Sequence, residues 1–102
     1  MERLLVLYGH PNDPQAFDKY YEEIHIPLGK KMKGLKKWTV SKVLNDPSNP
    51  SPFYYIADLY AENKEAMDKV LASPEGKKTA DDVPNFATGG VTFLRTEVKE
   101  II

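Results

Sequence analysis

The chain contains no cysteine, and this absence removes several kinds of chemistry at once. Disulfides, thiolate nucleophiles and zinc or iron–sulfur sites built on cysteine are excluded. The two histidines, His10 and His25, fall in separate segments without carboxylates at ligand spacing, so we expect no metal site. Nucleotide motifs are lacking too, because Gly89 and Gly90 stand alone and no Walker lysine is present. We expect no cofactor.

The sequence also has little net charge and no long apolar run. Its 14 basic residues nearly balance its 15 acidic ones, for a formal net charge of −1. Such a balance offers no field that attracts nucleic acid or an anionic membrane surface. The apolar segment at residues 4–8 is too short for the hydrophobic core of a signal peptide or for a membrane span. We therefore expect a cytoplasmic protein that binds neither nucleic acid nor membrane.

What is present is enough apolar sequence for one domain, residues 1–102, with 41% hydrophobic and 28% charged residues. Runs typical of strands occupy residues 3–9, 35–43, 53–60 and 91–95. Amphipathic or well-capped helices are predicted over residues 14–28, 63–72 and 75–82. The order predicts an α+β fold of the ferredoxin-like βαββαβ kind, with a four-stranded antiparallel sheet.

The first helix carries clear start and bend signals. Asp13 is the predicted N-cap, and Pro14 is the first helical residue. Pro27 removes one backbone hydrogen bond late in this helix and should bend it. We predict that its apolar stripe comprises Phe17, Tyr20 or Tyr21, Ile24 and Leu28.

The strands do not alternate cleanly between apolar and polar residues. The run at residues 3–9 predicts a strand that is buried on both faces. In the third strand we expect Tyr54, Ile56 and Tyr60 to share with Asp58 the face that the helices leave open. Because monomers rarely expose an apolar face of this size, we predict a homodimer through the open sheet face. The alternative is a monomer whose tyrosines extend their hydroxyls into water.

Several short motifs follow one another along the chain. They are Phe17-x-x-Tyr20-Tyr21-x-x-x-His25-x-Pro27-Leu28, then Gly34-Leu35, Ala57-Asp58-Leu59-Tyr60, Met67, Ser73-Pro74-Glu75-Gly76 and Asp81-Asp82-Val83-Pro84-Asn85-Phe86. Their joint order resembles the EthD family, which is named for a protein linked to ethyl tert-butyl ether degradation. The resemblance implies a protomer that pairs into a dimeric α/β barrel, with a pocket between sheet and helices. Relatives by fold include cofactor-free monooxygenases, muconolactone isomerases and polyketide cyclases.

His25 is the first candidate for a catalytic role. Its side chain titrates near neutral pH and could move a proton on a small organic acid or an enolisable ketone. The resemblance points the same way, because some enzymatic relatives use a histidine at the matching position with a tyrosine or cysteine; here Trp38 stands where a tyrosine is common. The alternative is structural, with the imidazole capping the Glu23 carbonyl that Pro27 leaves free.

Asp58 is the second candidate, because a carboxylate in an apolar strand needs a partner. We expect it to pair with a lysine or arginine, or else to act as a catalytic base. Five aromatic residues are predicted to line a pocket for a hydrophobic, aromatic-derived small molecule, with plain packing as the alternative. These residues are Tyr8, Tyr21, Trp38, Tyr54 and Tyr60.

Two functions of different classes follow from these residues and the resemblance. One is a cofactor-independent enzyme of isomerase, cyclase or oxygenase type, in catabolic or secondary metabolism, with His25 as its acid or base. The other is a non-catalytic binding or accessory protein of a degradation pathway.

Overall fold

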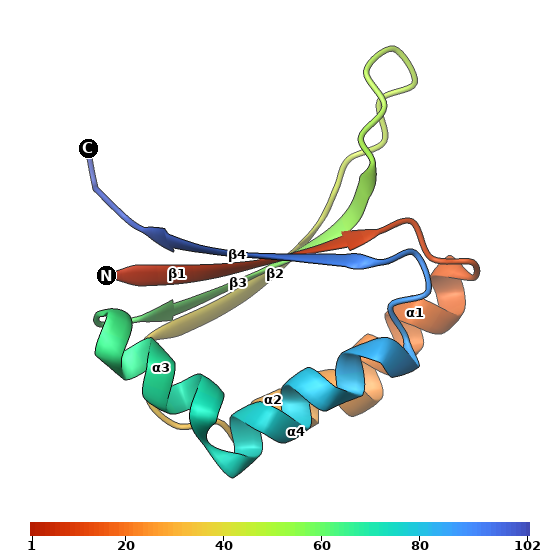
Figure 1. Cartoon of the computed structure of the whole chain (residues 1–102). Coiled ribbons are helices and arrows are strands. Elements are labelled where there is room, and N and C mark those ends of the chain that lie inside the picture. The colour runs from red at the N-terminus through yellow and green to blue at the C-terminus, as the bar shows by residue number, and fades with distance from the viewer.

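The computed structural model describes all 102 residues and contains a four-stranded antiparallel sheet with helices on one face (Figure 1). The strands β1 (Glu2–Gly9), β2 (Lys37–Lys42), β3 (Phe53–Ala61) and β4 (Val91–Glu97) lie in the order β2-β3-β1-β4. The helical elements are α1 (Pro14–Tyr20), the π-helical turn η1 (Tyr21–His25), α2 (Ile26–Gly29), α3 (Lys64–Ala72), α4 (Pro74–Asp82) and the 3-10 turn η2 (Val83–Asn85). The predicted α+β, ferredoxin-like fold is confirmed. None of these helices has the length and apolar character needed to cross a membrane.

Side-chain caps decide where the helices begin. Asp13 accepts a hydrogen bond from the Ala16 amide at 3.1 Å, and Pro14 follows at the first helical position. Ser73 accepts one from the Gly76 amide at 3.0 Å, with Pro74 next to it. Each cap satisfies an amide that the first helical turn leaves without a partner. The predicted start of the first helix at Asp13 and Pro14 is confirmed, and α4 begins at Pro74, one residue before the predicted start at residue 75.

Strand β1 alternates within one chain, contrary to the prediction that both of its faces are buried. Leu4, Val6 and Tyr8 are buried against the helices. Leu5 and Leu7 point to the other face and are only half-buried. The physical reason is that a single layer of helices covers a single face of the sheet (Figure 1).

The buried stripe of the first helix agrees with the prediction at Phe17 and Tyr21 and departs from it after them. Phe17, Tyr21, His25 and Gly29, each four residues after the last, are buried, whereas Ile24 is 48% exposed. In an α-helix a four-residue step drifts by about 40° around the axis. The wider π turn, in which the Ile26 amide bonds the Tyr21 carbonyl, offsets that drift. These four positions therefore all face the sheet, and the prediction for Ile24 is wrong.

A β-bulge redirects Tyr54. Tyr8 pairs with Tyr55 and Gly9 pairs with Phe53, so Tyr54 is an extra residue in β3. Its ring packs edge-on against Phe17, and its hydroxyl donates to Asp18 of α1 at 2.7 Å. The prediction that Tyr54 lies on the open face is wrong, because the bulge interrupts the strict alternation of side chains along the strand.

Candidate functional site

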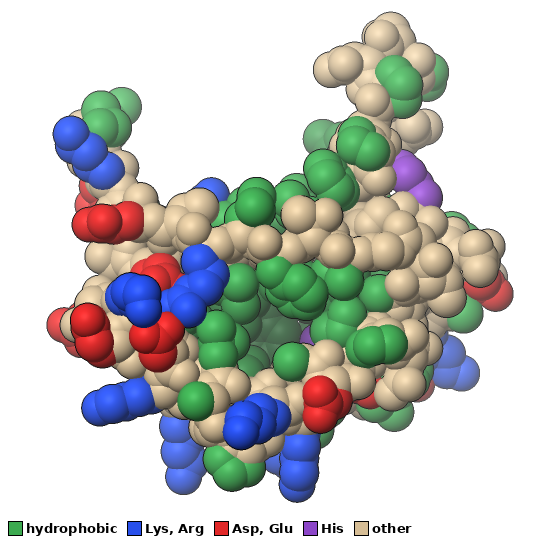
Figure 2. All heavy atoms as spheres, viewed as in Figure 1, with side chains coloured by type: hydrophobic (Ala, Val, Ile, Leu, Met, Phe, Trp, Pro, Cys, Tyr) green, Lys and Arg blue, Asp and Glu red, His purple; other side chains and the backbone are tan.

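A cavity of about 420 Å³ lies between the helices and the face of the sheet that they cover. Figure 2 shows its mouth as a hollow surrounded by hydrophobic side chains. Of its 16 lining residues, 12 are hydrophobic, among them Leu4 and Val6 of β1 and Ala57 and Leu59 of β3. The volume falls in the range of about 300–1,000 Å³ that is typical of small-molecule sites. The cavity thus suits a small apolar molecule.

His25 lines this cavity and forms a buried pair with Asp82. Its Nδ1 lies 2.9 Å from Asp82 Oδ2, so Nδ1–H donates to the carboxylate and Nε2 keeps its lone pair. Asp82 Oδ1 accepts two further hydrogen bonds, from the Tyr20 hydroxyl at 2.6 Å and from the Asn85 amide at 3.1 Å. Three donors from α1, η1 and η2 therefore hold the carboxylate, and the carboxylate orients the imidazole.

Burial and hydrogen bonding set the charge of this pair. Burial lowers the pKa of His25 below its ordinary value, and the nearby Asp82, which favours the protonated form, only partly offsets this effect. Burial acts to raise the pKa of Asp82, but hydrogen bonds from Tyr20, His25 and Asn85 outweigh it, and the net pKa is lowered. At neutral pH the pair is a neutral imidazole beside a carboxylate, which is the state of a general base.

Three of the five predicted aromatic residues, Tyr8, Tyr21 and Trp38, line the cavity together with His25. Burial raises the pKa of both Tyr8 and Tyr21 far above the ordinary value, so both hydroxyls stay protonated. Trp38 packs against α2, where a Cβ added at Gly29 would lie 2.5 Å from its ring. The structure thus gathers one candidate base and three aromatic residues around one space.

The other candidates lie elsewhere. Tyr54 bonds Asp18 outside the cavity, and Tyr60 lies on the opposite face of the sheet with the Lys37 ammonium 5.6 Å from its ring centre. Asp58 also faces away, because it alternates with two residues that line the cavity, and its carboxylate is 3.6 Å from Arg3. Pairing with an arginine was the first of its two predicted roles. Asp58 does not share a site with His25.

The alternative role of His25 as a cap for the Glu23 carbonyl is wrong, because its Nδ1 bonds Asp82 instead. Sequence reasoning missed Asp82 and its supports, Tyr20 and Asn85. Asp82 and Asn85 stand in the motif at residues 81–86, but nothing in that motif distinguishes Asp82 from Asp81. Only the packing of α4 against the first helical region shows which carboxylate meets the imidazole.

Fold and site together define the class: a ferredoxin-like α+β protein with a ligand-sized cavity between its sheet and its helices. Residues 10–90 match the model of the EthD domain. The chain is also 40% identical over 102 residues, 100% of its own length and 99% of the relative's, to an uncharacterized 11.0 kDa protein in the thcB–thcC intergenic region of Rhodococcus erythropolis. The chain belongs to the EthD family, as predicted.

Solved structures agree with this assignment. An EthD family protein from Bacillus halodurans is 32% identical with a TM-score of 0.90, over 97% of this chain and 99% of that one. SnoaB of Streptomyces nogalater, a cofactor-independent oxygenase, is 13% identical with a TM-score of 0.65 (99% and 94% covered). A dimeric protein of unknown function from Bacteroides fragilis is 14% identical with a TM-score of 0.67 (95% and 95% covered). The last two likenesses show the fold alone.

Proposed function

We propose that this protein is an enzyme that moves a proton on a hydrophobic, aromatic-derived small molecule, with His25 as the acid–base group. The observation that carries this proposal is the His25–Asp82 pair at the wall of the apolar cavity. Asp82 occupies Nδ1, so the ring presents Nε2 as the free base. Burial keeps the imidazole neutral, which is the form that accepts a proton.

The simplest reaction for this arrangement is enolisation. Nε2 of His25 takes a proton from a carbon next to a carbonyl group, and the electron pair of that C–H bond forms a C=C bond while the carbonyl π pair moves to oxygen. In a substrate with a β,γ double bond the product is a dienolate, and return of the proton to its γ carbon gives the conjugated isomer, with all atoms conserved. Attack of the enolate carbon on a second carbonyl of the same molecule closes a ring, and the oxygen of that carbonyl takes the proton from His25. An oxygenase reaction of the enolate needs dioxygen as co-reactant.

Deuterium exchange tests the proton transfer without knowledge of the natural substrate. 2-Tetralone, a two-ring enolisable ketone, is incubated with the protein in D2O, and the loss of its C1 proton signal is followed by NMR. We expect wild-type protein to accelerate exchange over buffer, and His25→Asn to lower the accelerated rate by about 10²–10⁴-fold, which is the usual effect of a positioned base. His10→Asn is the matched control, because His10 Nε2 bonds the Ser51 carbonyl at an exposed position outside the cavity.

Asp82→Asn should lower the exchange rate as well, because it removes the carboxylate that orients the ring. Circular dichroism of each variant shows whether the fold is kept. Equal exchange by wild type and His25→Asn, with both folded, would contradict the proposal.

A second function, binding without turnover, is favoured by the largely hydrophobic lining of the cavity, where 12 of the 16 residues are hydrophobic and suit an apolar ligand. Under this second function the protein is a non-catalytic binding or accessory protein of a degradation pathway. Native mass spectrometry of freshly purified protein tests this reading. A co-purifying small molecule that is released unchanged, together with no exchange above buffer, would favour binding over catalysis.

We also infer that the working form is a homodimer through the open sheet face. That face carries Leu5, Leu7 and Ile56 half-buried and Leu94 at 47% exposure. Nε of Arg3, on the same face, lies 3.6 Å from Asp58 Oδ1 and forms no hydrogen bond in the single chain. The structural relative from Bacteroides fragilis is described as dimeric. A self-complementary contact of this face would cover the apolar side chains and give a symmetric dimer.

A further inference from the structure

The floor of the cavity has two ends, which the register of the sheet places. Tyr8 of β1 pairs with Val91 of β4, and Leu4 of β1 pairs with Arg95 of β4. Tyr8, Leu4 and Arg95 all line the cavity. A strand rises by about 3.3 Å per residue, so the Tyr8 row and the Leu4 row are about 13 Å apart. The cavity thus extends along β1 from one row to the other.

His25 lies at the Tyr8 end of this floor. Its ring centroid is 4.9 Å from that of Tyr21 and 4.7 Å from that of Phe86. Both of those rings pack against Tyr8, with centroids 5.8 Å and 5.5 Å away. A ligand that brings its reacting carbon to His25 therefore has its body over Val6, toward the Leu4 row.

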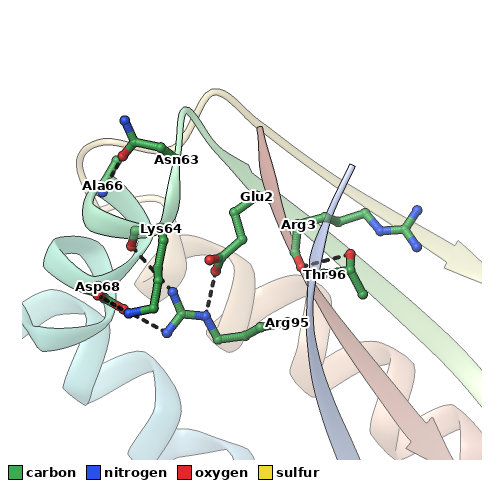
Figure 3. Close-up of polar contacts among 8 residues, drawn as sticks. All are labelled: Glu2, Arg3, Asn63, Lys64, Ala66, Asp68, Arg95 and Thr96. Atoms are coloured by element: carbon green, nitrogen blue, oxygen red, sulfur yellow. Dashed lines mark hydrogen bonds and ion pairs between the residues drawn. The ribbon is translucent and has the colours of Figure 1, made fainter. Parts of the chain in front are cut away.

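Arg95 stands at the Leu4 end as a fixed side chain. It is the only lysine, arginine, aspartate or glutamate in the lining. Its Nε bonds Glu2 of β1, one terminal nitrogen lies 2.8 Å from Asp68 of α3, and the other reaches the Lys64 carbonyl of α3 at 3.4 Å (Figure 3). Every nitrogen of the guanidinium thus has a partner. The side chain cannot move aside for a ligand without breaking two ion pairs.

Displacement of Arg95 is costly because of the carboxylate that it covers. Glu2 points to the same face of β1 as Leu4, is only 9% exposed and lies outside the lining. An apolar ring that passed beyond Leu4 would separate Arg95 from Glu2 and leave a buried carboxylate without a partner. An anionic ligand gains little from the same guanidinium, because two carboxylates already neutralise it. This end of the cavity therefore neither yields to an apolar ligand nor attracts a charged one.

We propose that Arg95 determines ligand length, so that the cavity selects compact uncharged ring compounds and rejects those with a further ring beyond the Leu4 row. The proposal rests on the proposed function insofar as the cavity is the ligand site. The length is measured from His25: the enolisable carbon lies at the Tyr8 end, and the far edge of the ligand meets the guanidinium. Arg95 is thus a specificity-determining residue and takes no part in the proton transfer.

The test compares 2-tetralone with 6-phenyl-2-tetralone, which carries a further ring at the end remote from the ketone. Trp38 is the only tryptophan and lines the cavity, so its single indole N–H signal in a ¹H–¹⁵N NMR spectrum reports binding. We expect the wild type to bind 2-tetralone more tightly than the longer ketone. Arg95→Ala should tighten binding of the longer ketone by about 10- to 100-fold, the usual gain from burying one more ring, and leave that of 2-tetralone nearly unchanged.

Lys36→Ala is the matched control, because it removes a basic side chain that pairs with a glutamate, Glu62, outside the lining. It should leave both affinities unchanged. Equal affinity of the wild type for the two ketones, binding of neither, or no gain for the longer ketone in Arg95→Ala would each overturn the proposal. An equal change of both affinities would overturn it too, because a merely structural role gives that result. If Arg95→Ala does not fold, the double variant Glu2→Gln/Arg95→Ala removes the unpaired charge and tests the same preference.

The deuterium exchange assay on the same samples separates this proposal from the proposed function. Exchange of both ketones at equal rates by the wild type overturns the length limit and leaves proton transfer standing. A length preference in binding without exchange of either ketone supports the limit in a protein that binds and does not turn over its ligand.

Discussion

At the scale of single residues, two opposing effects set the pKa of His25. Burial lowers its pKa, and Asp82, 2.9 Å away, raises it by less. A histidine with its pKa below about 6.5 in the folded state binds its proton less readily than the unfolded chain does. Stability is therefore fully present above about pH 6.5 and is lost as the pH falls below that value. If the effect of Asp82 on the pKa of His25 were larger than that of burial, the pKa would be raised instead, and stability would be lost as the pH rises.

The lowered pKa of His25 predicts how the stability depends on pH. The free energy of unfolding of the wild type should decrease between pH 7.5 and pH 5.5, and His25→Asn should show a smaller decrease over the same range. Urea titrations at the two pH values measure both slopes. The exchange rate of 2-tetralone should fall over the same interval, because the protonated imidazole is not a base. A wild-type protein that becomes more stable at pH 5.5 would contradict the direction assigned to burial.

Sequence reasoning reached His25 but not its partner. A histidine two residues before a proline is visible in the chain, and its chemistry follows from its residue type. Asp82 lies 57 residues away, and its role depends on the approach of α4 to η1. A carboxylate next to an identical carboxylate, Asp81, has no distinguishing local pattern, so the pair was beyond prediction from one sequence.

At the scale of elements, Pro27 is the second residue of the short helix α2, which directly follows the π turn. Proline inside a helix costs about 3 kcal/mol relative to alanine. We expect Pro27→Ala to leave the melting temperature unchanged or to raise it, because alanine restores a backbone donor. Differential scanning calorimetry measures this. A large fall in melting temperature would show that the π turn depends on the proline, and with it the orientation of the Tyr21 and His25 side chains.

Gly29 is the contact between α2 and Trp38. A Cβ at this position would lie 2.5 Å and 2.8 Å from two ring atoms of the indole. Gly29→Ala should therefore displace the ring and destabilise the protein by about 1–3 kcal/mol, the usual cost of overpacking. Urea unfolding measures the loss, and the single indole signal reports the displacement.

The double variant Gly29→Ala/Trp38→Phe is the control for this contact. Its smaller ring should relieve the clash, so the two changes should not add. Additive losses would show that the clash with Trp38 is not the cause.

At the scale of the whole molecule, the open sheet face sets the oligomeric state. Leu7 lies in the central strand β1 and pairs with Ile56 on one side and Thr92 on the other. Sedimentation of the wild type should give about twice the 11.6 kDa of one chain. Leu7→Lys should give monomers, because it places a charge in the middle of the contact.

Ile24→Lys is the matched control, because Ile24 is exposed on the helical layer. It should sediment as the wild type does. A wild-type protein that is monomeric at micromolar concentration would overturn the dimer. So would a Leu7→Lys variant that stays folded and dimeric.

The sequence by itself determined the elements of this protein and their order. The helix starts at Asp13 and Ser73 depend on a capping side chain and on the proline that follows it. The strands are predicted by runs of β-branched and aromatic residues. Both kinds of signal are local in the sequence. Only the tertiary structure decided the bulge at Tyr54, the π turn at Tyr21–His25 and the approach of Asp82 to His25. Each of these depends on how the two βαβ halves pack across the sheet. That packing joins residues far apart in the chain, and no local pattern specifies it.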